Sequence, residues 1–133
     1  MKPPRDPSRA PDRNVLGQPL GLCSNDPMTG FFRDGCCSTG TDDHGLHVVC
    51  VRVTAKFLEF SQATGNDLST PRPEYRFPGL KPGDQWCVCA LRWRDALMAG
   101  AAAPIRLEST HEAVLKIIPI DTLLAHAVGL DVV

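Results

Sequence analysis

The stretch FFRDGCCSTGTDDHGLHVVC, residues 31–50, gathers residue types that bind metals or act as nucleophiles. It holds three of the six cysteines together with two histidines and three aspartates. Thiolates and imidazoles are zinc ligands, and a thiolate becomes a nucleophile where neighbouring groups stabilise it. Metal binding, thiol chemistry and phosphate binding are therefore the alternatives to weigh for this stretch.

Phosphate binding fits the stretch poorly. Gly35 and Gly40 have the G-x-x-x-x-G spacing of a Walker loop, but Thr41 stands where the lysine should follow, and Asp42 comes next. Asp42 also stands where a cysteine-phosphatase loop starting at Cys36 would need an arginine. Both phosphate loops are excluded, although backbone N–H groups of the stretch could still bind something small.

Metal binding is the sharper hypothesis, although the strong C-x₂₋₄-C spacing of zinc sites is missing. Cys87 and Cys89 would share one face if they lay on a strand. Zinc is the first ion to test, because reduced thiols with imidazole suit it. The candidate ligands, brought together from distant segments, are Cys36, Cys37, His47, Cys87 and Cys89.

A thiol-dependent enzyme is the second hypothesis. Cys36 or Cys37 would attack, because the preceding Arg33 could stabilise a thiolate. His111 would be the base, since it lies in the first turn of a predicted helix, where the helix dipole favours neutral imidazole. The alternative for Cys50, Cys87 and Cys89 is ordinary core packing, because cysteine is among the most buried residue types.

The proline-rich loop 66–84 is longer than a simple connection. In it, Arg72, Glu74 and Arg76 alternate with Pro73, Tyr75 and Phe77, so an extended chain would separate charges from aromatic rings. The arginines could hold an anionic small molecule. The alternatives are that the aromatic rings anchor the loop to the core, or that the loop is the contact surface of a non-catalytic interaction module with an unknown protein partner.

Length and composition indicate one soluble domain. The chain has 133 residues, 43% of them hydrophobic, and a net charge of −1, so it lacks the basic excess that nucleic-acid binding demands. Its longest apolar run, residues 96–105, is too short for a membrane span. Residues 1–13 read as a disordered tail without a signal-peptide core. We therefore expect a cytoplasmic protein whose six cysteines are free thiols rather than disulfides.

The apolar patterning predicts a single α+β domain over residues 14–133, with a small mixed sheet, three to four short helices and long loops. Strands are expected at 14–22, 47–53, 85–90 and 103–108. Helices are expected at 54–62, where Thr54 caps and Val53, Phe57 and Phe60 form the buried stripe, and at 91–100 with Trp93 and Leu97 buried. Two further helices would be capped by Ser109, through its spacing to Glu112, and by Asp121.

The chain resembles the bacterial proteins grouped as domain of unknown function 2237. The resemblance rests on NVLGQPL, DPMTGFFRDGCC, HVVC, FLEFSQATGNDLSTPRPEYRFPGLKPGDQWCVCALRW and LESTHEAVL, which cover nearly the whole chain after residue 13. It implies a cytoplasmic single-domain protein with no established activity. It also implies that the family's motif positions here are Arg33, Asp34, Cys36, Cys37, His47, Cys50, Asn66, Asp67, Asp84, Trp86, Cys87, Cys89, Arg92 and His111.

The leading hypothesis is a polar pocket that joins the Cys36–Cys37 loop, His47, the proline-rich loop and His111 around a small ligand or zinc. The side chains expected to bind the ligand are Asp34, Asn66, Asp67, Arg72, Arg76, Asp84 and Arg92. The thiol enzyme and the interaction module remain the two alternatives.

Overall fold

Two short antiparallel strands, β1 (Val49–Arg52) and β2 (Gln85–Val88), lie at the centre of the computed structural model, which describes residues 12–128. The strand predicted at 47–53 is confirmed as β1, whose valines suit a buried pleated surface. In their register, Cys50 pairs with Cys87. The strand expected at 103–108 is reduced to a bridge between Ile105 and Val51 on the other edge of β1.

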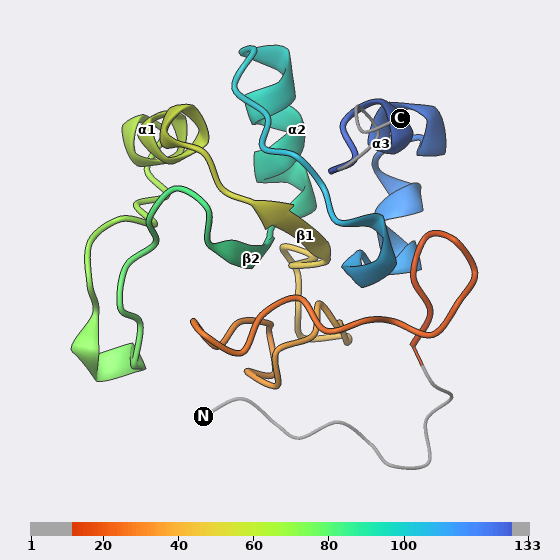
Figure 1. Cartoon of the computed structure of the whole chain (residues 1–133), viewed down its shortest axis with the longest axis horizontal. Helices are drawn as coiled ribbons and strands as arrows, with labels where there is room; N and C mark the ends of the chain where they lie inside the picture. The colour runs from red at the N-terminus through yellow and green to blue at the C-terminus, as the bar shows by residue number, and fades with distance from the viewer. Residues whose placement is uncertain (1–11, 129–133) are drawn as a thin grey trace.

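Three α-helices lie on one side of this sheet, as Figure 1 shows. They are α1 (Ala55–Ala63), α2 (Ala90–Met98) and α3 (Ile120–Ala125). Thr54 caps α1 as predicted, because its hydroxyl accepts the N–H of Phe57 at 3.1 Å. This small sheet with its helices confirms the predicted α+β class.

The apolar core lies between the strands and the helices. Its largest fully buried side chains are Trp93, Phe57, Ile105, Ile118 and Leu123. The buried face of α1 consists of Phe57, Leu58 and Ser61, so the predicted stripe through Phe60, which is only half-buried, was one position off. Trp93 also donates its indole N–H to the carbonyl of Ala103, which satisfies the one polar atom of that ring.

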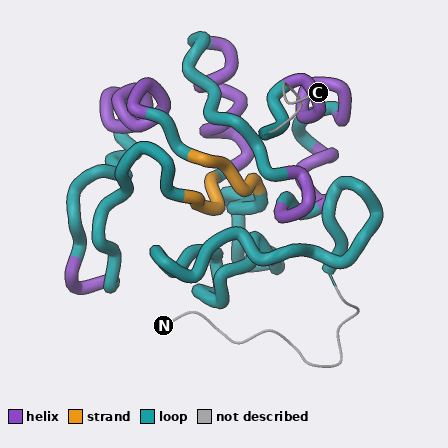
Figure 2. The backbone as a smooth tube through the Cα atoms, in the orientation of Figure 1, coloured by secondary structure: helices purple, strands orange, loops and turns teal. Residues whose placement is uncertain are grey.

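The N-terminal segment, residues 12–47, covers the opposite side of the sheet and has almost no regular structure (Figures 1 and 2). The strand expected at 14–22 is wrong, because this part forms only isolated bridges. Instead, the side chain of Asn14, which is 2% exposed, bonds the N–H groups of Leu16 and Gln18 and the carbonyls of Pro19 and Glu108.

The third predicted helix is also wrong. Residues 107–116 form two 3-10 helices, η2 (Leu107–Ser109) and η3 (Glu112–Lys116), in place of one α-helix capped by Ser109. Ser109 is the last residue of η2, where its hydroxyl donates to the carbonyl of Leu22, and η3 is capped by His111, whose Nδ1 accepts the N–H of Ala113. Asp121 lies in the first turn of α3, whose N-cap is Pro119.

The remaining 3-10 helix, η1 (Pro73–Tyr75), is at the tip of the proline-rich loop, which extends away from the helices on the α1 side (Figure 1). None of the helices between residues 12 and 128 is both long enough and apolar enough to cross a membrane.

Candidate functional site

Two disulfides join the N-terminal segment to the sheet. Cys23 is bonded to Cys50 on β1, and Cys37 is bonded to Cys87 on β2. The expectation of six free thiols is therefore wrong for these four cysteines. It was inferred from a reducing compartment, whereas the structure brings each loop cysteine against one member of a cross-strand pair. The cytoplasmic location itself stays a prediction.

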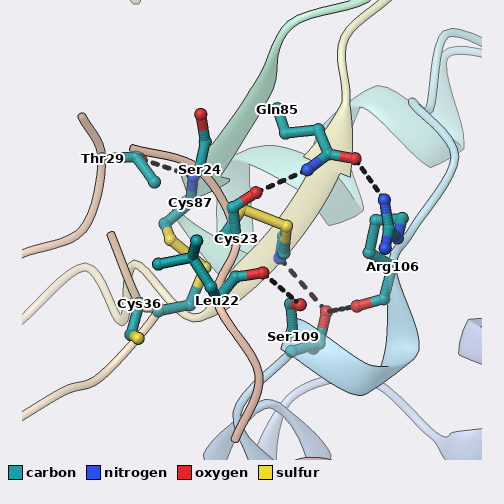
Figure 3. The surroundings of a disulfide bond; sticks show 12 residues. Leu22, Cys23, Ser24, Thr29, Cys36, Gln85, Cys87, Arg106 and Ser109 are labelled. Atoms are coloured by element: carbon teal, nitrogen blue, oxygen red, sulfur yellow. Dashed lines mark hydrogen bonds between the residues drawn. A yellow bond between two sulfur atoms is a disulfide. The ribbon is translucent and has the colours of Figure 1, made fainter. Parts of the chain in front are cut away.

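The four bridged cysteines form one buried cluster. Their exposed fractions are 0–2%, and the Sγ atoms of Cys23, Cys37 and Cys87 all lie within 4.8 Å of one another. Cys37 therefore carries no free thiol for the nucleophilic role expected of it. Cys36 lies outside both disulfides, and Figure 3 shows its sulfur pointing away from the bridged sulfurs.

Hydrogen bonds fix the protein around the cluster (Figure 3). The Gln85 amide donates to the carbonyl of Cys23 and accepts from Arg106, while the Thr29 hydroxyl accepts the N–H of Cys87 at 2.9 Å. At the other end of the cluster, the N–H of Cys50 donates to the hydroxyl of Thr110 at 3.1 Å. These bonds satisfy backbone groups that would otherwise be buried without partners.

His47 is held by a buried carboxylate just before β1. Its Nδ1 lies 2.6 Å from Oδ1 of Asp43, whose side chain has no exposed surface. Oδ2 of Asp43 also accepts the backbone N–H of His47 and the hydroxyl of Thr39. With Nδ1–H donating to the carboxylate, Nε2 of a neutral imidazole carries the lone pair. The His47 side chain is 45% exposed, so that lone pair can reach a ligand.

Two pockets meet at His47. The larger, of about 260 Å³, is lined by Gly45, His47, Asn66, Leu68, Trp86, Cys87, Val88, Cys89 and Arg92. The smaller, of about 180 Å³, is lined by Gly30, Phe31, Arg33, His47, Trp86 and Cys87. His47, Trp86 and Cys87 belong to both linings, so the imidazole stands between two neighbouring hollows.

Cys89 enters the larger pocket from the start of α2. It is the N-cap residue rather than part of β2, so it does not share a strand face with Cys87 as predicted. A Cβ added to Gly45 would lie 3.1 Å from Cε1 of His47 and 3.4 Å from Sγ of Cys89. Glycine at position 45 thus leaves open the space between the imidazole and the thiol.

Arg33 belongs to the smaller pocket. Its guanidinium lies 5.3 Å from the ring centre of Trp86 and donates to the carbonyl of Met28. The pKa of Arg33 is lowered because its cation is partly desolvated there. Its backbone is left-handed, with φ of 56°, a conformation that costs free energy in a non-glycine residue. Gly30 must be glycine here, because an added Cβ would lie 2.4 Å from the carbonyl oxygen of Cys36.

A family comparison identifies the group of proteins to which the chain belongs. The model of a family described as an uncharacterized protein conserved in bacteria (DUF2237) matches residues 13–127. The chain belongs to the DUF2237 family. No curated protein matches it. The resemblance found in the motifs is therefore confirmed, and of the cysteines at motif positions Cys37, Cys50 and Cys87 form disulfides, whereas Cys89 lines the larger pocket.

In this DUF2237 member, the remaining predicted site residues divide into three groups. Asn66 and Arg92 reach the larger pocket. Asp34, Asp67 and Asp84 accept backbone N–H groups two or three residues away, so their carboxylates organise turns. Arg72 and Arg76 are exposed on the proline-rich loop and line neither pocket.

Two further expectations meet structural reasons against them. Both ring nitrogens of His111 are engaged, Nδ1 by the N–H of Ala113 and Nε2 by Asp12 at 3.1 Å, and the residue is 7% exposed. That ring has no lone pair available to act as the base. Of the two aromatic rings in the proline-rich loop, Phe77 packs into the core against Trp86, whereas Tyr75 is 69% exposed.

Sequence reasoning missed Asp43, which positions His47. The signal was present as Asp43-x₃-His47, a carboxylate four residues before an imidazole, but this spacing has meaning only when the turn between them is known. Asp42 and Asp43 are adjacent, and the first is exposed while the second is buried. Only the fold distinguishes them.

Proposed function

We propose that the protein binds a small anionic molecule in the larger pocket, with His47 and Arg92 as the polar anchors. The observation that carries the proposal is the Asp43–His47 pair, which holds one imidazole at the junction of two pockets. A side chain locked by a buried hydrogen bond is preorganised for binding. The Asn66 amide adds a donor and an acceptor to the same lining.

The charges around the pockets favour an anion. Arg92 lines the larger pocket, Arg33 lines the smaller one, and no carboxylate appears among the described residues that line either. Asp43 lies behind the imidazole, and its oxygens are already bonded. A volume of about 260 Å³ is slightly below the roughly 300–1,000 Å³ of pockets for drug-sized ligands, so the ligand should be small.

Acetate and acetamide make a matched test, because they differ mainly in charge. We expect acetate, titrated into isotopically labelled protein, to shift the amide NMR signals of Gly45, His47 and Cys89 more strongly than acetamide. Arg92→Gln should weaken the acetate effect several-fold, while Arg72→Gln, on the outer loop, should leave it unchanged. Equal responses to acetate and acetamide, or an acetate effect mapped only to other segments, would contradict an anion pocket.

Zinc binding by the reduced protein is a second candidate function, supported by the sulfur cluster. The Sγ atoms of Cys23, Cys37 and Cys87 already lie within 4.8 Å of one another, and Cys50 is bonded to Cys23. Thiolates are zinc ligands, and four of them make the closed tetrahedral set of structural zinc sites. This set replaces the one predicted from the sequence, because Cys89 and His47 belong to the pocket and Cys36 points elsewhere.

Elemental analysis tests the zinc site. Protein reduced with a phosphine, exposed to zinc and desalted should retain about one zinc per chain. Cys23→Ser should lose that zinc, whereas Cys36→Ser should keep it. Reduced protein that stays folded without zinc uptake, or equal uptake by the two variants, would end the hypothesis.

A further inference from the structure

Asp43 is hydrogen-bonded to His47, and His47 lines the same pocket as Cys89. A thiol enzyme needs these three types of group as the orienting group, the base and the nucleophile. We infer that Cys89 is a nucleophile for acyl transfer from a small ester or thioester, that His47 is its base and that Asp43 is a positioning residue. This inference deepens the proposed function, because the same pocket binds the acyl compound. It replaces the pair predicted from the sequence, in which Cys36 or Cys37 was the nucleophile and His111 the base, because the structure does not support that pair.

Cys89 has the position that a thiol nucleophile requires. It is outside both disulfides, half-buried and part of the pocket lining. The N–H of Ala90, the next residue, donates to the carbonyl of Leu46 at 3.1 Å, which fastens the start of α2 to the residue preceding His47. This bond holds the backbones on either side of the pocket together, and the space beside Gly45 borders both Sγ of Cys89 and Cε1 of His47.

The imidazole has the carboxylate hydrogen bond that a base requires. Asp43 accepts Nδ1–H, so Nε2 is left to take a proton, and the charged imidazolium that forms would be stabilised by the buried carboxylate. The Phe31 ring stacks beside His47, with ring centres 6.4 Å apart and planes at 25°. Both contacts restrict rotation of the ring before any substrate arrives.

The pocket also offers groups that stabilise developing negative charge. The first N–H groups of an α-helix have no acceptor within the helix, and in α2 those of Leu91 and Arg92 come after the N–H of Ala90, which is already bonded to Leu46. Such groups favour an oxyanion on a carbonyl carbon attacked by the N-cap side chain. The Arg92 side chain, tied through one nitrogen to the carbonyl of Thr64, adds a fixed cation.

The proposed reaction needs no redox partner. Sγ of Cys89 forms a bond to the carbonyl carbon while its proton passes to Nε2 of His47. The bond from that carbon to the leaving oxygen or sulfur then breaks, and the departing group takes the proton from His47. Water attacks the resulting thioester while His47 accepts a proton of that water, the bond from the carbonyl carbon to Sγ breaks, and His47 returns the proton to Sγ, so that the acid and the free thiol are released.

p-Nitrophenyl acetate tests the nucleophile. In Cys36→Ser protein with both disulfides intact, we expect release of nitrophenolate together with one acetyl group on Cys89, seen by mass spectrometry. His47→Asn in that background should slow acetylation about 100-fold, within the usual range for loss of a general base. Acetylation of other residues only, or an unchanged rate in His47→Asn, would overturn the inference.

A glycine pair separates reactivity from stability. Gly45→Ala places a methyl group between His47 and Cys89 at a residue without positive φ, so it should slow acetylation at least tenfold while the protein stays folded. Gly40→Ala adds the same group to the same loop beside Phe32 and should leave the rate unchanged. Equal rates in the two variants would contradict the contact across Gly45.

A proton NMR measurement tests whether Asp43 positions His47, in addition to any structural role. The Nδ1–H proton of His47, bonded to a carboxylate at 2.6 Å, should give a far-downfield proton signal. Asp43→Asn should remove that signal and slow acetylation of Cys89. An unchanged signal and an unchanged rate would show that Asp43 does not position the base.

The outcomes distinguish this inference from the anion pocket. If acetylation depends on His47 but acetate and acetamide bind equally, the anion pocket is wrong and the assignment of Cys89 as nucleophile stands. If acetate binding depends on Arg92 but acetylation does not depend on His47, the anion pocket stands and the assignment of Cys89 as nucleophile is wrong.

Discussion

The helical part of the molecule and its N-terminal segment are held together by different interactions. Residues 48–125 contain both strands and all three α-helices, packed around Trp93, Phe57 and Ile105. Residues 12–47 bury few large apolar side chains and depend on two disulfides and on side-chain hydrogen bonds to the backbone. The candidate site lies where the two parts meet, with His47 from one and Cys89 from the other. A loop can present a catalytic side chain once cross-links hold it on a rigid support.

The largest expected effect comes from emptying the helical core. Phe57→Ala should lower the free energy of unfolding by about 3–5 kcal/mol, through lost burial and the cavity it leaves. Leu16→Ala, a large-to-small change at a 49% exposed position of the N-terminal segment, should cost less than about 0.5 kcal/mol. Denaturant unfolding measures both. Similar losses would show that the two parts share one apolar core.

Removing a disulfide should come next. Replacing Cys37 and Cys87 with serine should cost about 2–4 kcal/mol. Loss of Cys23–Cys50, which spans 27 residues rather than 50, should cost roughly 0.5 kcal/mol less by loop-closure entropy. Hydrogen exchange should show residues 23–47 losing protection before α1 and α2 do. Simultaneous loss in both parts would contradict their separate support.

A buried amide should have an intermediate effect. Asn14→Ala leaves four backbone groups without the side chain that bonds them, so it should cost about 1–3 kcal/mol. Asn25→Ala, on the exposed part of the same segment, should be nearly neutral. Thermal or denaturant unfolding compares the pair, and a neutral Asn14→Ala would show that the segment does not depend on these bonds.

The smallest effect concerns Asp67 in the proline-rich loop. The pKa of this carboxyl is lowered, first by the hydroxyl of Thr70 and then by the N–H of Ser69. A lowered pKa in the folded protein gives stability that is present above the ordinary value of about 3.9 and is lost as the pH falls through the folded value. Thr70→Val should move the NMR titration midpoint of Asp67 upward. A midpoint unchanged by Thr70→Val would rule out that hydrogen bond.

Sequence patterns predicted β1, α1 and α2 well and the N-terminal segment and residues 103–116 poorly. Thr54 and the valines of β1 act through local periodicity and capping, which a short stretch of sequence contains in full. The pairing of Cys23 with Cys50 and of Cys37 with Cys87 depends on which segments meet, and four cysteines allow three connectivities. Asn66, Cys89 and Arg92 were correctly expected at a site. Asp43 was missed, because its role also depends on how the chain folds around it.

Disulfide mapping of the native protein tests the central claim most directly. The free thiols of the native protein are first blocked with iodoacetamide, without reduction, and the protein is then digested with trypsin and with a protease that cleaves before aspartate. Tandem mass spectrometry should then show peptides joined as Cys23–Cys50 and Cys37–Cys87. Cys36 and Cys89 should carry the alkyl group. A bridge that includes Cys89, or alkylation of all six cysteines in the folded protein, would contradict the account, because His47 would then lack the cross-linked support that presents it to a reduced thiol.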